Sequence, residues 1–428
     1  MSVLIEGGQV LTPEGFEPGW VLVAGGQVAQ VGAGDPPEAV QAGQVLSARG
    51  AAVIPGLVNA HTHLSQTFMR GLGGGRPLLR WLKERIWPLQ AAMSVAQLRL
   101  AALLGLVENL HCGATHVTNH HKVATTPAHS DAVCQAALDV PLRMTLARAW
   151  VDRGANAEPA EAVLADLGRM FDQWHGAGGT LSVASGPLAT WRCSAQTMRA
   201  AHALAVERGS FTHIHVAETR DEVETSLQET GMHPVQWLDS LGVLDANCQV
   251  VHAVWVDSDE IDLLARSGAL VIHCPISNTV LGSGIAPVAR LIDAGARLRL
   301  GSDGPASNDT QDIWEVLKTA VQLARVSTQD PTVLPPMGAL GLALSQPAVT
   351  PGMPADLAVV NLEHARAAPV HEVESALVLC THGTDVRHVL VAGRPLLVDG
   401  AVTVLDEPAL LAECTRVAAS LRAAAGIG

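Results

Sequence analysis

Aromatic and charged residues are scarce in this sequence of 428 residues. There is no tyrosine, there are four phenylalanines, and charged residues make up 16% of the chain, against 48% hydrophobic residues. This balance excludes disorder as the main state. Only Lys83, Lys122 and Lys318 are lysines, and 41 acidic against 27 basic residues give a net charge of −14. Negative charge argues against a nucleic-acid groove. Aromatic contacts in any binding site must then come mainly from tryptophan.

Paired cysteines and long apolar runs are also missing. None of the seven cysteines has C-x-x-C spacing, so we expect neither a disulfide framework nor a cysteine zinc site. Polar residues or Gly and Pro break every apolar run before ~20 residues, so nothing is expected to span a membrane. The first residues lack the basic segment of a secretory signal. We expect a cytoplasmic protein with a small-molecule substrate, and the apolar composition is compatible with a homo-oligomer.

Short apolar runs alternate with helical segments through the middle of the chain. Eight such β-then-α units predict a closed parallel barrel. An open doubly wound sheet would usually show a Gly-x-Gly-x-x-Gly turn after its first strand, whereas here that strand ends in His61-Thr-His63. The strands are expected to end near residues 61, 119, 150, 186, 215, 252, 273 and 300. Helices are expected from Ser94, with Gln97 completing a capping box, and near residues 127–140, 158–176, 194–208, 234–241, 257–267, 287–295, 310–325 and 407–425.

Both ends of the chain have a different character, with short strands and Gly-rich turns. Residues 21–31 form a hairpin pattern around Gly25-Gly26. Residues 357–362, 386–391 and 395–398 are the strand candidates near the other end.

His61 and His63 stand two residues apart at the end of the first barrel strand. Residues i and i+2 of a strand share a face, so both imidazoles can bind one transition metal. The alternative is a hydrogen-bonded turn. In parallel barrels the chemistry lies at the C-terminal ends of the strands, which is where these histidines are expected.

His215 ends the fifth strand run, and Glu218 follows three residues later. A histidine ligand beside a carboxylate that does not bind the metal is suited to proton transfer. His213, on the same strand face, is the competing ligand, and Glu218 has the alternative role of an acid at a helix N-terminus.

His252, His273 and Asp303 follow the last three strand runs. Each histidine is a candidate ligand, a group that polarises the substrate, or a core histidine, and Asp303 is a candidate ligand or a turn aspartate. Three imidazoles, one carboxylate and an open position for water would make a catalytic divalent site. The predicted metal ligands are His61, His63, His215 and Asp303.

These residues stand in phrases that resemble the amidohydrolase superfamily. The phrases are PGLVNAHTHL at 55–64, HVAET at 215–219, HCPISN at 273–278, GSDGPASND at 301–309 and PGMPADL at 351–357. The resemblance implies an α/β fold, a distorted (β/α)8 TIM-type barrel with a small β-sandwich made by both chain ends. The expected domains are a sandwich part at 1–52, the barrel at 53–345, and the second sandwich part with a closing helix at 346–428.

Within that superfamily, the sequence resembles the mononuclear, cytosine-deaminase-like branch, nearest to 8-oxoguanine deaminase and hydroxyatrazine-type aminohydrolases. Residues 180–193 lack the lysine that bridges two metals in binuclear members, so one divalent ion is expected, zinc first and iron as the alternative. Leu188 follows Gly186-Pro187 where nucleoside deaminases of this branch carry histidine, so a bulky adenosine substrate is not expected. Residues 329–340 look short for the family, and the helix before the sandwich is expected to be trimmed.

The resemblance implies hydrolytic deamination of an aminated purine-, pterin- or triazine-like ring. Asp303 would hold the metal and orient or deprotonate water, Glu218 would deliver a proton to the ring, and His252 would face the oxyanion. The alternatives are hydrolysis of another C–N or a C–Cl bond, and a barrel that binds a metal or ligand without catalysis. Arg148 has the alternative role of pairing with an acid. The substrate contacts expected are Gln66, Trp81, His121, Arg148 and Trp191.

Overall fold

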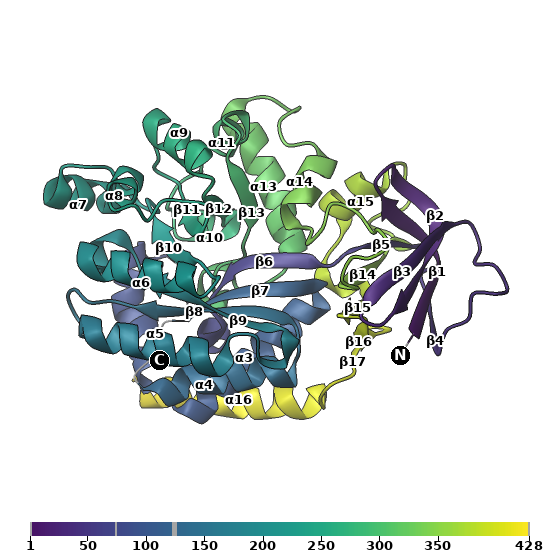
Figure 1. Cartoon of the computed structure of the whole chain (residues 1–428), viewed down its shortest axis with the longest axis horizontal. Coiled ribbons are helices and arrows are strands. Elements are labelled where there is room, and N and C mark those ends of the chain that lie inside the picture. The colour runs from purple at the N-terminus through teal and green to yellow at the C-terminus, as the bar shows by residue number, and fades with distance from the viewer. Residues whose placement is uncertain (1, 73–74, 122–125, 427–428) are drawn as a thin grey trace.

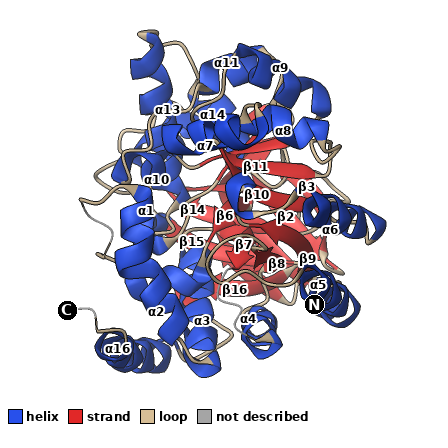
Figure 2. Ribbon diagram, turned by 90° about the vertical axis from the view of Figure 1, so that its left-hand side faces the viewer, coloured by secondary structure: helices blue, strands red, loops and turns tan. Residues whose placement is uncertain are grey.

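An eight-stranded parallel barrel forms the larger part of the molecule. The computed structural model describes residues 2–72, 75–121 and 126–426. Neighbouring strands follow one another around the barrel in chain order, and Asp303 N, just after the last strand, donates to His61 O of the first at 2.9 Å. The predicted barrel is therefore confirmed, and Figure 2 shows helices around its strands. The strands are β6 (Leu57–Thr62), β7 (Ala114–His121), β8 (Arg143–Trp150), β9 (Leu181–Pro187), β10 (Thr212–Val216), β11 (Cys248–His252), β12 (Leu270–His273) and β13 (Arg297–Leu300).

The helices expected between these strands are present. Ser94 Oγ accepts from Gln97 N at 3.2 Å and Gln97 Oε1 accepts from Ser94 N at 2.8 Å, which is the predicted capping box. The helices after the barrel strands are α3 (Val95–His111), α4 (Pro127–Asp139), α5 (Ala160–Trp174), α6 (Ala195–Glu207), α7 (Arg220–Thr230), α8 (Pro234–Ser240), α9 (Ser258–Ser267), α10 (Pro275–Val280), α11 (Val288–Asp293), α12 (Pro305–Asn308) and α13 (Ile313–Thr328).

Two further helical segments lie outside the regular alternation of strands and helices. The helix before the sandwich, which was expected to be trimmed, is the eight-residue α14 (Pro336–Ala343), packed against α13 and β13. Its two glycines weaken its helix propensity, but burial of Leu340 and its alanine neighbours outweighs that. The second segment follows β6 and was not anticipated. It consists of η1 (Leu64–Met69), α1 (Leu78–Trp81), a π-helical turn η2 (Leu82–Ile86) and α2 (Trp87–Ala92).

Strands from both chain ends form a second sheet, at the right of Figure 1. Its hydrogen-bonded order is β17-β16-β15-β14-β5-β1-β2-β3, with β4 beside β1, so it is one continuous mixed sheet. Ala355 N donates to Gly26 O and Gly393 N donates to Ala355 O, both at 2.9 Å, so the turns after β2 and β15 meet and the sheet closes over its own core. The strands are β1 (Ser2–Thr12), β2 (Gly15–Ala24), β3 (Gln27–Ala33), β4 (Gln44–Ser47), β5 (Ala51–Pro55), β14 (Leu357–Asn361), β15 (Val386–Val391), β16 (Arg394–Val398) and β17 (Ala401–Val402).

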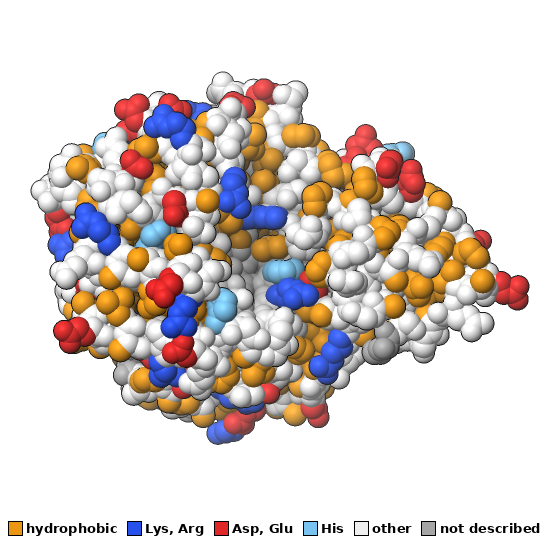
Figure 3. Space-filling model, viewed as in Figure 1, with side chains coloured by type: hydrophobic (Ala, Val, Ile, Leu, Met, Phe, Trp, Pro, Cys, Tyr) orange, Lys and Arg blue, Asp and Glu red, His pale blue; other side chains and the backbone are white. Residues whose placement is uncertain are grey.

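The C-terminal segment returns to the barrel. Helix α15 (Val373–Cys380) packs against α13 and α14, and α16 (Glu407–Ala424), yellow in Figure 1, packs against α3 and α2. In the described part of the chain no single helix is long and apolar enough to cross a membrane. One pair of helices bent by 112°, Leu78–Ala92 and Val95–His111, passes on length and composition together. On the face drawn in Figure 3, acidic and basic side chains are interspersed.

Candidate active site

Three histidines and one aspartate meet at the C-terminal ends of the barrel strands. His61 lies in β6, His63 just after it, His215 in β10 and Asp303 just after β13. The ring centroids of His61 and His63 are 4.8 Å apart, and that of His215 lies 5.0 Å and 5.4 Å from them. Asp303 Oδ1 is 3.2 Å from His61 Nε2 and 3.3 Å from His63 Nε2. The structure thus brings together all four residues predicted as metal ligands, called the ligand cluster below.

Backbone carbonyls set which nitrogen carries the proton in two of these histidines. His63 Nδ1 is 2.6 Å from His120 O, and His215 Nδ1 is 2.6 Å from Leu188 O. A carbonyl oxygen only accepts, so both Nδ1 atoms are protonated and both Nε2 atoms have a free lone pair. That tautomer is the one needed for a metal bound through Nε2.

His61 is oriented in the same way by a side chain. Its Nδ1 lies 2.8 Å from His213 Nε2, and His213 Nδ1 lies 2.8 Å from Gln249 Oε1. With protons on both Nδ1 atoms, the chain from His61 through His213 to Gln249 is fully satisfied, and His61 Nε2 faces Asp303. His213, the competing ligand in the sequence, therefore lies behind His61, and Gln249 was not anticipated.

Asp303 is held in a tight backbone turn. It has a φ of 61°, a conformation that aspartate tolerates better than most residues, and a Cβ added to Gly301 would lie 2.8 Å from His61 Cβ. Asp303 Oδ2 accepts from Ser277 Oγ at 2.5 Å and from Ser307 Oγ at 3.1 Å. These bonds leave Oδ1 facing the histidines.

The ionisation of the ligand cluster suits a cation. Burial alone would raise the pKa of Asp303, but the close approach of His61 and the other nearby histidines holds that pKa well below its usual range. Burial lowers the pKa of His61 to about 4 and that of His215 well below its usual value, so the imidazoles are neutral at neutral pH. Three neutral imidazoles with free Nε2 atoms and one carboxylate fit a divalent transition metal.

Glu218 and His252 lie together beside the ligand cluster. Glu218 Oε2 is 3.6 Å from His252 Nε2, and Glu218 Oε1 accepts from Ser283 Oγ at 3.2 Å. His252 Nδ1 is 2.9 Å from Asn278 Oδ1. Burial, more than any other cause, raises the pKa of Glu218, which favours its protonated form.

Glu222, in the first turn of α7, holds the Glu218 backbone in place. Its Oε2 accepts from Glu218 N at 2.9 Å and its Oε1 accepts from Thr190 Oγ1 at 3.0 Å. Burial raises the pKa of Glu222 to about 7. The sequence analysis did not single out Glu222.

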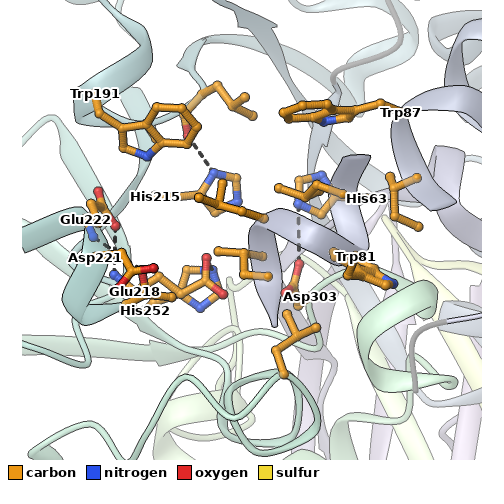
Figure 4. A pocket seen from close by; sticks show the side chains of 18 of the residues that line it. His63, Trp81, Trp87, Trp191, His215, Glu218, Asp221, Glu222, His252 and Asp303 are labelled. Atoms are coloured by element: carbon orange, nitrogen blue, oxygen red, sulfur yellow. Dashed lines mark hydrogen bonds and ion pairs between the residues drawn. The ribbon is translucent and has the colours of Figure 1, made fainter. Parts of the chain in front are cut away.

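A cavity extends from the ligand cluster to the helical segments above it. Gln66, Trp81 and Trp191, three predicted substrate contacts, line it, as do Glu218 and His252. Trp87 of α2 was not anticipated, and Figure 4 shows it across from Trp191. Part of the lining comes from helical segments that follow the strands, namely α1, η2, α2, the turn at 190–192 and α7. The residues Leu78, Leu79, Leu82, Trp87, Trp191, Asp221 and Thr225 of these segments are called the outer end below.

Arg148 does not line this cavity, so its prediction as a substrate contact is corrected. Its guanidinium pairs with Glu158 at 2.5 Å and with Asp166 of α5 at 2.9 Å. The side chain therefore leaves β8 on the face toward the outer helices, and two carboxylates compensate its charge. This is the alternative role that the sequence left open.

His121 is also absent from the cavity lining. It is fully buried at the end of β7, while the ring of the preceding residue, His120, lies 4.6 Å from that of His215 and 5.6 Å from that of His63. Successive strand residues point to opposite faces, so His120 rather than His121 points towards the other histidines, and neither is among the described lining residues. His273, which the sequence left open, is buried without being a lining residue.

Comparison with known proteins assigns the class. The model of the Amidohydrolase family matches residues 52–396, and the chain belongs to this family. It is 36% identical over 430 residues to a 5'-deoxyadenosine deaminase from Methanothermobacter thermautotrophicus, covering 98% of this chain and 99% of that protein. It is 37% identical over 383 residues to a 5-methylthioadenosine/S-adenosylhomocysteine deaminase from Haloarcula marismortui, covering 87% and 88%. Among solved structures, a zinc-bound adenosine deaminase from Xanthomonas campestris superposes with a TM-score of 0.91 at 30% identity over 98% of both chains.

Proposed function

We propose that this protein is a metal-dependent hydrolytic deaminase of an aminated N-heterocycle. The observation that carries the proposal is the position of Glu218 and His252 beside the ligand cluster, on the wall of a cavity lined by three tryptophans. Hydrolysis of the bond between a ring carbon and its exocyclic amino group needs a proton donor, a metal site and flat apolar walls, and the cavity offers candidates for all three.

Each residue at the strand ends has a separate role in the proposed reaction. His61, His63, His215 and Asp303 would hold one divalent ion, which supplies Lewis-acid chemistry and lowers the pKa of water towards ~7. Asp303 takes a proton from the attacking water. Glu218 delivers a proton to the ring nitrogen next to the carbon under attack, and His252 faces the oxygen that develops negative charge. Asp303 then passes its proton to the exocyclic amino group, the bond between that group and the ring carbon breaks to release ammonia, and the Glu218 carboxylate takes the proton of the new hydroxyl group.

Two buried polar atoms of the cavity are available to a heterocycle. Gln66 Oε1 and Trp81 Nε1 have no hydrogen-bond partner within the described ranges, although both residues line the cavity. One is an acceptor and the other a donor, and a buried polar atom without a partner destabilises the protein. A nitrogen heterocycle presents both kinds of group on its edge, which supports Gln66 and Trp81 as substrate contacts.

We propose zinc as the ion, since a similar deaminase structure contains zinc, with iron as the alternative. The particular ring is open between two kinds. Leu188 favours a base without a sugar, such as 8-oxoguanine, a pterin or an aminotriazine, whereas similar proteins carry the names of adenosine-derivative deaminases.

Ammonia release from a panel of heterocycles tests the proposal. The protein is stripped of metal, reconstituted with zinc or iron, and assayed on 8-oxoguanine, guanine, cytosine, isoxanthopterin, aminotriazines, adenosine and 5'-deoxyadenosine. We expect ammonia from at least one compound, loss of activity without metal, and recovery with it. Chloride release from a chlorotriazine without any deamination would favour the C–Cl alternative. Full metal occupancy with no turnover of any compound would favour a barrel without catalysis.

A further inference from the structure

Among the residues that the structure describes, the charged side chains that line the cavity all have the same sign. They are the carboxylates Glu218, Asp221, Glu222 and Asp303, and no lysine or arginine is among the described lining residues. Glu218 and Asp303 belong to the chemistry at the strand ends. Asp221 and Glu222 lie instead in the first turn of α7, where Glu222 is buried and Asp221 is exposed. A substituent that reaches from the heterocycle towards solvent along α7 would therefore meet Asp221.

Two arginines beside the outer end, Arg192 and Arg220, have other partners. Arg192 lies over the rings of Trp87 and Trp191, but its Nη2 donates to Ala155 O at 2.5 Å and its Nε to Arg153 O at 3.1 Å. Arg220 lies 4.1 Å from the centroid of Trp255 and lines a separate groove. Neither Arg192 nor Arg220 is among the described lining residues of the cavity.

Asp221 differs from the other lining carboxylates in being exposed and available. Within the described residues its carboxylate has no hydrogen bond and no ion pair, whereas Glu222 already accepts from Thr190 and from the Glu218 backbone. The N-terminus of a helix alone would attract an anion, but Asp221 and Glu222 already place two carboxylates in that turn. The field at the outer end therefore favours hydrogen-bond donors and cations.

We propose that the cavity admits heterocycles whose substituent is uncharged or cationic and excludes phosphorylated ones, with Asp221 as a specificity-determining residue. The inference rests on the proposed function for its substrate class. It predicts that the protein distinguishes a nucleoside from the nucleotide that carries the same base. A phosphate would lose its hydration against carboxylates and tryptophans, with no lysine or arginine among the described lining residues to compensate it.

A series of three adenine nucleosides that differ only in the charge at the 5' position tests this inference. The compounds are 5'-amino-5'-deoxyadenosine, adenosine and adenosine 5'-monophosphate. With the zinc-loaded wild type we expect kcat/KM for the monophosphate to be at least about 100-fold below that for adenosine. The Asp221 and Glu222 carboxylates repel the phosphate, and the phosphate loses hydration without gaining a cationic partner. The amino compound should match or exceed adenosine.

Asp221→Asn removes one charge at the outer end with little change of shape. We expect it to lower kcat/KM for the amino compound about fivefold, to raise that for the monophosphate by a similar factor, and to leave adenosine within about twofold. Glu224→Gln is the matched control, because Glu224 is an exposed acid on the same helix that lines the separate groove. It should change none of the three values.

Binding of the same compounds, followed by quenching of tryptophan fluorescence, separates this inference from the proposed function. If none of the three releases ammonia but adenosine and the amino compound bind and the monophosphate does not, the charge selection stands while adenosine deamination fails. Equal use or equal binding of the monophosphate and adenosine would overturn the inference. An unchanged series in Asp221→Asn, or no binding by any of the three compounds, would overturn it as well.

Discussion

The ligand cluster and the outer end of the cavity differ in how their side chains are held in place. In the ligand cluster, each imidazole donates through Nδ1 to a fixed acceptor, and Asp303 accepts from two serines. At the outer end, the walls are apolar side chains from short helices, and Asp221 is exposed. A network in which every hydrogen-bonding group has a partner holds its side chains in fixed positions, as catalysis requires. Apolar side chains of a cavity wall can be replaced without breaking such a network, so substrate preference at the outer end can change more easily.

The largest effect is expected at the ligand cluster. Asp303→Asn keeps the shape of the side chain but removes the charge that faces His61 and His63, so we expect metal occupancy to collapse and kcat/KM to fall by on the order of 10³-fold or more. Metal analysis and ammonia release check both. Asp309→Asn is the control, because Asp309 follows in the same segment and bonds Gly71 N outside the cavity. Full zinc occupancy in Asp303→Asn would show that Asp303 is not a ligand.

Glu218→Gln should separate chemistry from metal binding. The amide keeps the hydrogen-bonding shape but has no proton to deliver, so we expect kcat to fall by about 10²–10⁴-fold, or ~3–5 kcal/mol, with zinc retained. Steady-state kinetics with parallel metal analysis measures the effect. Wild-type activity in this variant would refute the role of Glu218 as the proton donor.

His213→Asn tests the hydrogen bonds behind the ligand cluster. Because His213 orients His61 without lying among the proposed ligands, we expect zinc affinity or kcat/KM to fall by about 10–100-fold. Competition with a chelator measures the affinity. His202→Asn is a matched control, since His202 is also a buried histidine bonded to β10, at Thr212 Oγ1, away from the ligand cluster. Equal losses in both variants would mean that His213 only supports folding.

The smallest effect is expected at the outer end. Trp87→Leu removes part of a flat wall, so we expect KM to rise about tenfold with kcat within about twofold, since stacking binds the ground state and transition state alike. Steady-state kinetics on the heterocycle with the highest kcat/KM of the panel measures the changes in KM and kcat separately. If kcat of Trp87→Leu fell as far as kcat of Glu218→Gln, the outer end would contribute to the chemical step as the ligand cluster does, and the distinction between binding and catalytic regions would be wrong.

The ligand cluster could be predicted from the sequence because strand geometry is local. His61 and His63 share a strand face by spacing alone, and the ends of parallel barrel strands meet at one mouth, which brings in His215 and Asp303. The carbonyls of Leu188 and His120 and the amide of Gln249 that orient these rings carry no signal in the sequence, because a hydrogen-bond acceptor is defined only by its position.

The order of strands and helices, the hairpin at Gly25-Gly26 and the set of strand-end histidines were therefore determined by the sequence, through periodicity and turn chemistry that act over a few residues. Only the tertiary structure decided that Arg148 turns to Glu158 and Asp166, that His120 rather than His121 faces the other histidines, and that Trp87 reaches the cavity. Those outcomes depend on which face of a strand meets which neighbour and on how residues 78–92 pack. Both are settled by contacts between segments far apart in the chain.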